Sequence, residues 1–309
     1  MFRKLFSIFL SGVFLVSSLG TAAAEVPNTA NGKLGAVETV TYGQEQSGAI
    51  VERIEKVEKD YECTDNGSGM MNRINALYDA TFDNSNGPSL ITQLNALEWT
   101  ISHKVSADPI QKRITAMELE INGKNSEGSI KKRIEGLSTF AFGSTTIPLT
   151  QVNVPANTLV KVSLVTPINA KELKKGDVIK FQAAEDVIEN DMLLITAGAL
   201  GEGVVTEVSQ AQNFGRDAKI NIDFKDIEAV DGTKIDMTLG EEAKENMERM
   251  GMAAGASLAS MIILGPIGII GGAFVKGKNI NLPEGTEMYL QTEKDSTVYG
   301  IPTTSAEQF

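Results

Sequence analysis

A twenty-residue repeat in the N-terminal half is the feature that most constrains the fold of this chain. In five successive copies the first residue is apolar, and so are the residues four and seven positions later. These stripe residues are Ile50, Ile54 and Val57; Met70, Ile74 and Leu77; Leu90, Leu94 and Leu97; Ile110, Ile114 and Met117; and Ile130, Ile134 and Leu137. Spacings of four and three place them along one face of an α-helix. The repeat therefore predicts five helices of about three turns each within residues 41–140.

Short breaks rich in Gly, Ser and Pro separate the predicted helices. They are Ser47-Gly48, Gly67-Ser68-Gly69, Gly87-Pro88-Ser89, Asp108-Pro109 and Gly128-Ser129. Such residues cap helices and would interrupt a continuous coiled coil. A long polar side chain precedes the second stripe residue of each copy, and we expect it to flank the stripe. These side chains belong to Arg53, Arg73, Gln93, Arg113 and Arg133.

The predicted helices need a partner for their apolar stripe. A helix with one such stripe cannot bury it alone, so the helices pack on one another or on another chain. One interpretation is a self-packed array, and the other is a spacer or stalk that binds an envelope polymer or a sister chain. A compact bundle and an extended stalk bury the same stripe, so both remain open.

The first 24 residues have the pattern of a secretory signal peptide. Arg3 and Lys4 precede an apolar run over residues 5–16, and Thr21-Ala22-Ala23-Ala24 follows before Glu25. A charged start, a short apolar core and small residues at the end are typical of a cleavable signal. We therefore expect cleavage after Ala24 and export to the periplasm or cell envelope, with association with the outer membrane as one variant of this prediction. Residues 25–40 are predicted to be a linker.

Composition excludes several classes of function. The net charge of −12 argues against binding to nucleic acid, which depends on clustered Lys and Arg. One cysteine, Cys63, and one histidine, His103, do not suffice for a disulfide framework, a zinc site or a catalytic triad. We predict no catalytic residue, no cofactor, no metal and no enzyme activity. Hydrolysis of an envelope polymer is the enzymatic alternative.

Strand-like alternation replaces the helical period from Thr146 onwards. Strands are predicted at residues 159–165, 177–184, 192–195, 204–208, 219–225, 234–239 and 287–291. Asp231-Gly232 is expected to form the turn of a hairpin between two of them. The predicted fold class is α+β, with an N-terminal array of short helices and a C-terminal antiparallel β-barrel or sandwich over residues 146–292. Residues 293–309 are predicted to be a flexible tail.

A five-residue signature occurs three times in this second domain. Its copies are Val154-Pro155-Ala156-Asn157-Thr158, Ile195-Thr196-Ala197-Gly198-Ala199 and Leu282-Pro283-Glu284-Gly285-Thr286. An apolar residue, usually a proline, and then Gly or Asn favour a tight turn that leads into a strand. Because the first and last copies each precede a predicted strand, we expect them to belong to one barrel or sandwich.

An insertion over residues 250–275 carries no charged side chain. It contains glycines at spacings that let helices approach closely, and Gly265-Pro266 interrupts it. Each half is too short to cross a bilayer of about 30 Å, so a helical hairpin is favoured over a single span. We expect the hairpin to contact a membrane or sister subunits. The residues assigned to this role are Gly251, Gly255, Gly265, Pro266, Gly268 and Gly272.

The C-terminal half resembles a family of exported bacterial envelope proteins of undefined biochemical role. The resemblance covers residues 146 to about 292 and rests on Val154-Pro155-Ala156-Asn157-Thr158, Lys175-Gly176-Asp177, Ala184-Glu185-Asp186-Val187, residues 201–208, Asn213-Phe214-Gly215, Asp231-Gly232-Thr233, Gly277-Lys278 and Leu282-Pro283-Glu284-Gly285-Thr286. It is more distantly similar to the β-barrel domain of the outer-membrane channel component of conjugation-type secretion systems, in which a helical hairpin interrupts a barrel. The resemblance implies this architecture and no catalytic residues. Where the channel family has an inner-membrane anchor and a proline-rich linker, this sequence is expected to have a cleavable signal and the helical repeats, so only the architecture is carried over.

Together these features predict a non-enzymatic structural or interaction protein of the cell envelope. Its helical repeats would serve packing or attachment, and its glycine-rich hairpin would associate with membrane or with sister subunits in a homo-oligomer. The main alternative is an outer-membrane channel or a component of a secretion assembly.

Overall fold

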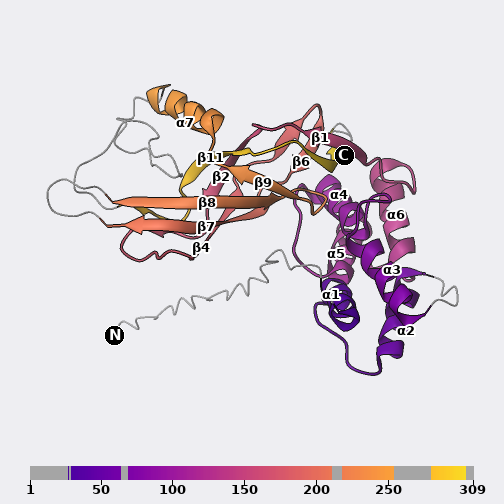
Figure 1. Ribbon diagram of the computed structural model, residues 1–309. Helices are drawn as coiled ribbons and strands as arrows, with labels where there is room; N and C mark the ends of the chain where they lie inside the picture. Colours follow the sequence, from indigo (N-terminus) through magenta and orange to yellow (C-terminus); the bar gives the residue numbers. More distant parts are fainter. Residues whose placement is uncertain (1–26, 28, 64–68, 211–217, 254–279, 304–309) are drawn as a thin grey trace, which may run out of the picture.

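The computed structural model describes residues 27, 29–63, 69–210, 218–253 and 280–303. Six helices come first in these residues, and twelve strands with one further helix follow. Helices α1–α6 form one unit, which we call the helical unit, and the remaining elements form the β-domain (Figure 1). The predicted α+β class, an N-terminal helical array with a C-terminal antiparallel barrel, is confirmed.

All five predicted helices are present, and each begins at the first stripe residue of its copy. They are α2 (Ile50–Tyr61), α3 (Met70–Phe82), α4 (Leu90–Ser102), α5 (Ile110–Asn122) and α6 (Ile130–Phe142). The second and third stripe residues are at most 4% exposed in every copy. The first stripe position is less uniform, because Met70 is 43% exposed whereas Ile110 is fully buried. The period-twenty pattern thus identifies the core of the helical unit.

A sixth helix, α1 (Ala30–Tyr42), precedes the predicted five. The prediction of a linker over residues 25–40 is therefore wrong. Leu34 and Val37 occupy the second and third stripe positions of this copy, and both are fully buried. The first stripe position holds only Ala30, so the apolar pattern is weaker at the start of α1 than in the later copies.

The helices pack on one another into a compact bundle. Helix α1 packs against α3 and α5, and α2 packs against α3 and α6. The ends of α2 and α6 are also joined, because the Ser129 hydroxyl donates to Glu62 Oε2 at 2.8 Å. Contacts between helices four copies apart are incompatible with an extended stalk. Of the two arrangements that bury the stripe, the structure has the bundle.

Six antiparallel strands close into a barrel in the order β11-β2-β4-β7-β8-β9. They are β2 (Leu159–Leu164), β4 (Val178–Ala183), β7 (Leu200–Ser209), β8 (Lys219–Glu228), β9 (Lys234–Thr238) and β11 (Glu287–Thr292). Alternate residues along β2 and β4 face the core, as Val160, Val162 and Phe181 show. Gly201 allows the close approach of this core, since a Cβ atom there would lie 2.4 Å from Cε2 of Phe181.

A second sheet of four strands lies beside the barrel in the order β1-β12-β6-β5. Its strands are β1 (Thr150–Val154), β5 (Val187–Glu189), β6 (Met192–Ile195) and β12 (Ser296–Pro302), while β3 (Ile168–Asn169) and β10 (Asn281–Leu282) pair separately. Strand β12 lies in the predicted flexible tail, so that prediction is wrong at least over residues 296–302. Val298 and Ile301 hold β12 in place, because each is 1% exposed.

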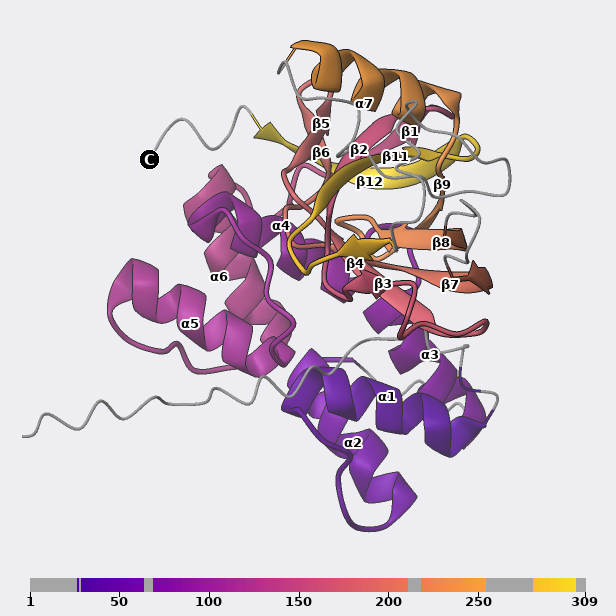
Figure 2. The ribbon, with the colours of Figure 1, turned by 90° about the vertical axis from the view of Figure 1, so that its left-hand side faces the viewer.

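The last helix, α7 (Glu241–Ala253), packs against β11. It lies at the end of the β-domain that is far from the helical unit, as both Figure 1 and Figure 2 show. None of the helices in the described residues is long and apolar enough to span a membrane.

Candidate functional site

A pair of charged side chains joins consecutive helices and recurs with the repeat. The ninth residue of one helix is a glutamate, and the fourth residue of the next is an arginine. The closest nitrogen-to-oxygen distances are 2.6 Å for Arg53–Glu38, 2.5 Å for Arg73–Glu58, 2.7 Å for Arg113–Glu98 and 2.6 Å for Arg133–Glu118. The arginines were expected to flank the stripe, and the structure shows that they bind a neighbouring helix. We call each pair a clamp.

Three of the four clamps also bind the loop between their two helices. The glutamate accepts a hydrogen bond from a backbone N–H eight residues later: Gln46 to Glu38 at 3.0 Å, Ser106 to Glu98 at 2.8 Å, and Ser126 to Glu118 at 3.1 Å. A buried carboxylate with several donors is strongly held, and removing its partner leaves an uncompensated charge. In these three copies the clamp therefore links two helices and the loop between them.

Burial and pairing act in opposite directions on the pKa values of the clamp residues. Burial lowers the pKa of the Arg113 guanidinium, and the nearby Glu98 carboxylate opposes this shift. For Glu118, burial alone would raise the pKa, but hydrogen bonds from Arg133 and from the Ser126 N–H lower it overall. Glu118 is thus held in its charged form by its donors.

The clamps divide the helical unit into two modules of three helices. The clamp is missing between α3 and α4, where Tyr78 and Gln93 occupy its two positions. The first helix of each module lacks the arginine, with Lys33 in α1 and Gln93 in α4. The third helix of each module lacks the glutamate, with Tyr78 in α3 and Ser138 in α6. Helices α1–α3 and α4–α6 are therefore equivalent modules, 60 residues apart in the sequence.

The β-domain docks where the clamp is missing. The backbone carbonyl of Asp231, in the turn between β8 and β9, accepts a hydrogen bond from Asn84 Nδ2 at 2.8 Å, and the Thr92 hydroxyl donates to it at 3.1 Å. The neighbouring carbonyl of Val230 accepts from Asn95 Nδ2 at 2.7 Å. We call this contact, made by Asn84, Thr92, Asn95, Val230 and Asp231, the joint.

Further contacts extend the joint into the apolar core of the helical unit. Val230, Leu193 and Ile301 of the β-domain pack in the same apolar cluster as the helical stripe. Asn95 Oδ1 accepts from Arg113 Nη2 at 2.7 Å, so the joint is continuous with a clamp of the second module. Trp99 Nε1 donates to Asp186 Oδ2 at 3.3 Å. The two units thus share a buried, hydrogen-bonded contact.

Asp231 is the buried carboxyl group of the joint. Its Oδ1 accepts from the Thr233 N–H at 2.9 Å, and its Oδ2 accepts from the Tyr299 N–H at 2.8 Å. Burial raises the pKa of this carboxyl group, and the two N–H donors partly oppose the shift. The predicted turn at Asp231-Gly232 is confirmed, since Gly232 has a φ of 81°.

The three copies of the five-residue signature occupy equivalent places in the barrel. Their fourth residues, Asn157, Gly198 and Gly285, all have positive φ and form tight turns before β2, β7 and β11. Each of these residues donates its N–H to the last residue of a neighbouring strand, at Thr292, Ala183 and Leu164 respectively. The expectation that the first and last copies belong to one barrel is confirmed.

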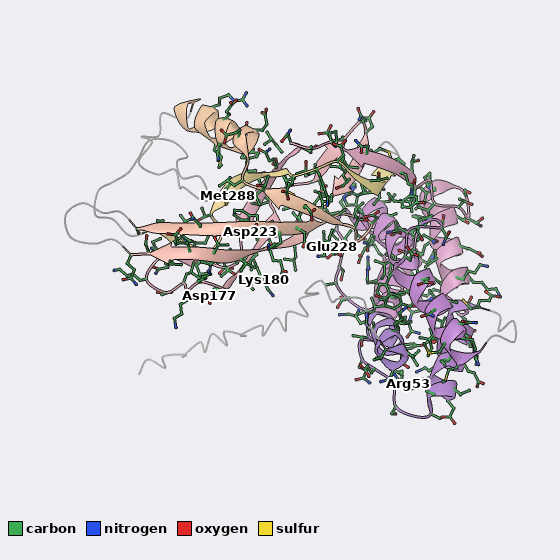
Figure 3. All side chains as sticks on the ribbon, viewed as in Figure 1. Arg53, Asp177, Lys180, Asp223, Glu228 and Met288 are labelled. Carbon is green, nitrogen blue, oxygen red and sulfur yellow. The ribbon has the colours of Figure 1, made fainter. Side chains whose placement is uncertain are left out.

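Both flanks of the charge-free insertion are bound to the β-domain. Upstream, the Ala243 N–H donates to Gln291 Oε1 at 3.0 Å, which fixes the start of α7 on β11. Gly240 permits this contact, because a Cβ atom there would lie 2.3 Å from Cδ of Gln291. Downstream, β10 pairs with β3, and β11 pairs with β2 and β9. In Figure 3, Met288 of β11 is labelled at the end of the β-domain where α7 lies, and Glu228 of β8 is labelled nearer the helical unit.

Most of the predicted hairpin residues lie outside the described residues. Gly251 is in the last turn of α7. Gly255, Gly265, Pro266, Gly268 and Gly272 belong to residues 254–279, which the structure does not describe. The role assigned to these six residues stays a prediction. In the described part of the chain, no group of three or more His, Cys, Asp or Glu side chains is placed to hold a metal ion.

Comparisons with known proteins find matches among solved structures. One of them is ComB10 of the Com Type IV secretion system of Helicobacter pylori, with a TM-score of 0.27, 15% sequence identity, and coverage of 46% of this chain and 88% of that chain. A TM-score of this size does not establish a shared fold. No family model and no curated protein matches the chain. The channel and secretion-assembly alternative, like the absence of enzyme activity, stays a prediction.

Proposed function

We propose that this protein is a non-enzymatic scaffold of the bacterial cell envelope. In this proposal the helical unit and the barrel form one jointed body, and the charge-free segment over residues 250–275 attaches that body to a membrane or to sister subunits. The observation that carries the proposal is the pairing of β9 with β11, in which Thr238 lies opposite Gln291. These two strands flank the segment in the sequence and are neighbours in the closed barrel.

The pairing of β9 with β11 makes the segment an excursion from a closed barrel. A chain that crossed a bilayer once between these strands would place them on opposite sides and could not pair them. An excursion that leaves and returns on one side keeps the barrel intact. Twenty-six consecutive uncharged residues, in a chain with 22% charged residues, favour an apolar surrounding for that excursion.

The helical unit offers no apolar stripe to another chain in this proposal. The second and third stripe residues of each copy are buried between the unit's own helices, as Ile54, Leu94 and Ile114 illustrate with no exposed surface. Attachment through this unit would therefore use polar surface, which suits an envelope polymer or a second protein with polar groups. Its main role in the proposal is to hold the barrel at a fixed place through the joint.

Replacing the segment tests the proposal. We would compare the mature protein with a variant in which residues 254–279 are exchanged for a glycine-serine linker of the same length, since equal length avoids strain between α7 and β10. We expect the mature protein to stay with membranes through an alkaline carbonate wash, or to form an oligomer. The linker variant should be soluble and should not form an oligomer through the segment. Near-ultraviolet circular dichroism of both proteins checks that the barrel is unchanged.

Two point variants separate the membrane from the subunit as the partner. Gly255→Leu and Gly268→Leu keep the segment apolar and obstruct close helix approach. If these variants stay with the membrane but associate more weakly with sister subunits, the segment contacts both the membrane and the subunits. If their subunit association is unchanged, the glycine contacts are removed from the proposal. A linker variant that fractionates and sediments like the mature protein would overturn the proposed function.

A further inference from the structure

The second sheet ends in an edge strand that lacks the usual protection. Strand β1 is the outermost strand of the order β1-β12-β6-β5, and its sequence Thr-Gln-Val-Asn-Val carries no charge and no proline. Natural edge strands are commonly guarded by charged residues, prolines, bulges or short length, because their free backbone groups can pair with another chain. The opposite edge, β5, has three such devices: it is three residues long, it ends in Glu189, and its register shifts between Val187 and Ile188.

The register identifies which backbone groups of β1 face outwards. Tyr299 of β12 lies opposite Gln151, and its N–H donates to Asp231 Oδ2, away from β1. Along an antiparallel strand successive residues point their backbone groups to alternate sides. Val298 and Gly300 therefore bond to β1 through Val152 and Thr150, and the backbone groups of Gln151 and Asn153 point away from the sheet. In the described residues, no hydrogen bond to these outward groups is recorded.

The outward edge of β1 is complementary to itself. An antiparallel pair of identical strands centred on Val152 would place Gln151 of one copy opposite Asn153 of the other. Both residues have outward N–H and C=O groups, so each such pair exchanges two hydrogen bonds. The side chains of Gln151 and Asn153 are exposed and on the same face, where their amides can also bond across the pair. A two-fold axis through Val152 generates this contact twice.

Charge favours this edge over other surfaces for contact between copies. The chain carries a net charge of −12, so two copies repel each other over most of their surface. Because β1 is uncharged, pairing of two β1 strands places no like charges opposite each other. We propose that two copies of this chain associate through their β1 edges and join their four-stranded sheets into one continuous sheet. This contact is separate from the segment in the proposed function and does not depend on it.

Charged residues at the edge provide the test. Analytical ultracentrifugation of the mature protein over a range of concentrations is expected to show a dimer, and Gln151→Lys with Asn153→Lys is expected to weaken dimerisation at least tenfold. The matched control is Gln44→Lys with Asn125→Lys, which adds the same charges by the same residue changes at exposed loop positions of the helical unit. The control should dimerise as the mature protein does.

The outcomes are distinct from those of the proposed function. The linker variant, which lacks the charge-free segment, should still form the β1 dimer, and the same two lysines should disrupt it. At concentrations low enough for both proteins to be monomeric, thermal unfolding of the lysine variant should match that of the control, because the altered side chains are exposed. A mature protein that is monomeric throughout, or a lysine variant that dimerises as well as its control, would overturn the inference.

Discussion

At the scale of single residues, the clamps hold consecutive helices together. Glu98 and Arg113 are the most enclosed pair, with side-chain exposures of 7% and 4%. Arg113 also binds Asn95 of the joint. Loss of the Glu98 carboxylate would leave the buried Arg113 guanidinium with the neutral amide of Asn95 as its remaining partner. The loss therefore affects the free energy of unfolding by more than one ion pair alone would suggest.

Glu98→Gln preserves the shape of the side chain and removes its charge. Breaking a buried pair by removing one partner costs about 3–5 kcal/mol, so we expect a loss of that order in the free energy of unfolding. The control is Lys112→Gln, because Lys112 and Asp108 form a pair that is 68% and 46% exposed. Exposed pairs contribute about 1 kcal/mol or less. Denaturant unfolding followed by the fluorescence of Trp99 measures both variants, and equal effects would contradict the clamp.

At the scale of elements, sequence patterns predict the helices well and the edges of the β-domain poorly. Helices α2–α6 begin where the stripe begins, because burial of that stripe is what holds them. Helix α1 was missed because Ala30 replaces a larger apolar residue. The clamp glutamates follow the same twenty-residue period, so the sequence contains a signal for them. Their pairing with the next arginine depends on how the two helices cross, which the sequence pattern does not give. The joint joins residues such as Asn95 and Val230 that are 135 positions apart, which no local pattern reports.

The sequence pattern does not predict β12, for a related reason. Strand β12 contains Gly300 and ends near Pro302, and both residues weaken a strand pattern. It forms because β1 and β6 pair with it on both sides. Gly300 is accepted there because a Cβ atom would lie only 3.1 Å from Met192 Cβ. Tertiary pairing therefore overrides local preference at this strand.

The joint between the two units should respond to pH through Asp231. Burial raises the pKa of Asp231 above 3.8 in the folded state, so the folded protein binds a proton that the unfolded chain releases. The resulting stability is present below pH 3.8 and is lost as the pH rises through the folded-state pKa. We expect the free energy of unfolding of the native protein to fall relative to that of Asp231→Asn as the pH rises from about 3.5 to 7.

Glu118 provides a control of opposite sign. Its hydrogen bonds lower its pKa, so its stabilising contribution is present above pH 4.5 and is lost as the pH falls through the folded-state pKa. The native protein should therefore lose its advantage over Glu118→Gln on acidification. Unfolding curves at several pH values measure both differences. Identical pH slopes for the two variants would contradict the assignment of these carboxyl groups.

At the scale of the whole molecule, the barrel joins parts of the chain that the insertion separates. Strands β9 and β11 pair across it, α7 packs on β11, and the three signature turns hold neighbouring strand ends together. The helical unit is attached at the other end through the joint. This arrangement ties the described residues on both sides of the charge-free segment to the β-domain, which is the basis of the proposed scaffold.

The most direct test of this account asks whether the two flanks of the segment lie on the same side of a membrane. Single cysteines would be placed at Glu241, which is 83% exposed before the segment, and at Lys294, which is 68% exposed after it, in a Cys63→Ser background. Spheroplasts carrying either protein would be treated with a membrane-impermeant maleimide. The account predicts equal labelling at both positions before and after membrane permeabilisation. Labelling of one position with protection of the other until permeabilisation would show a single crossing and contradict it.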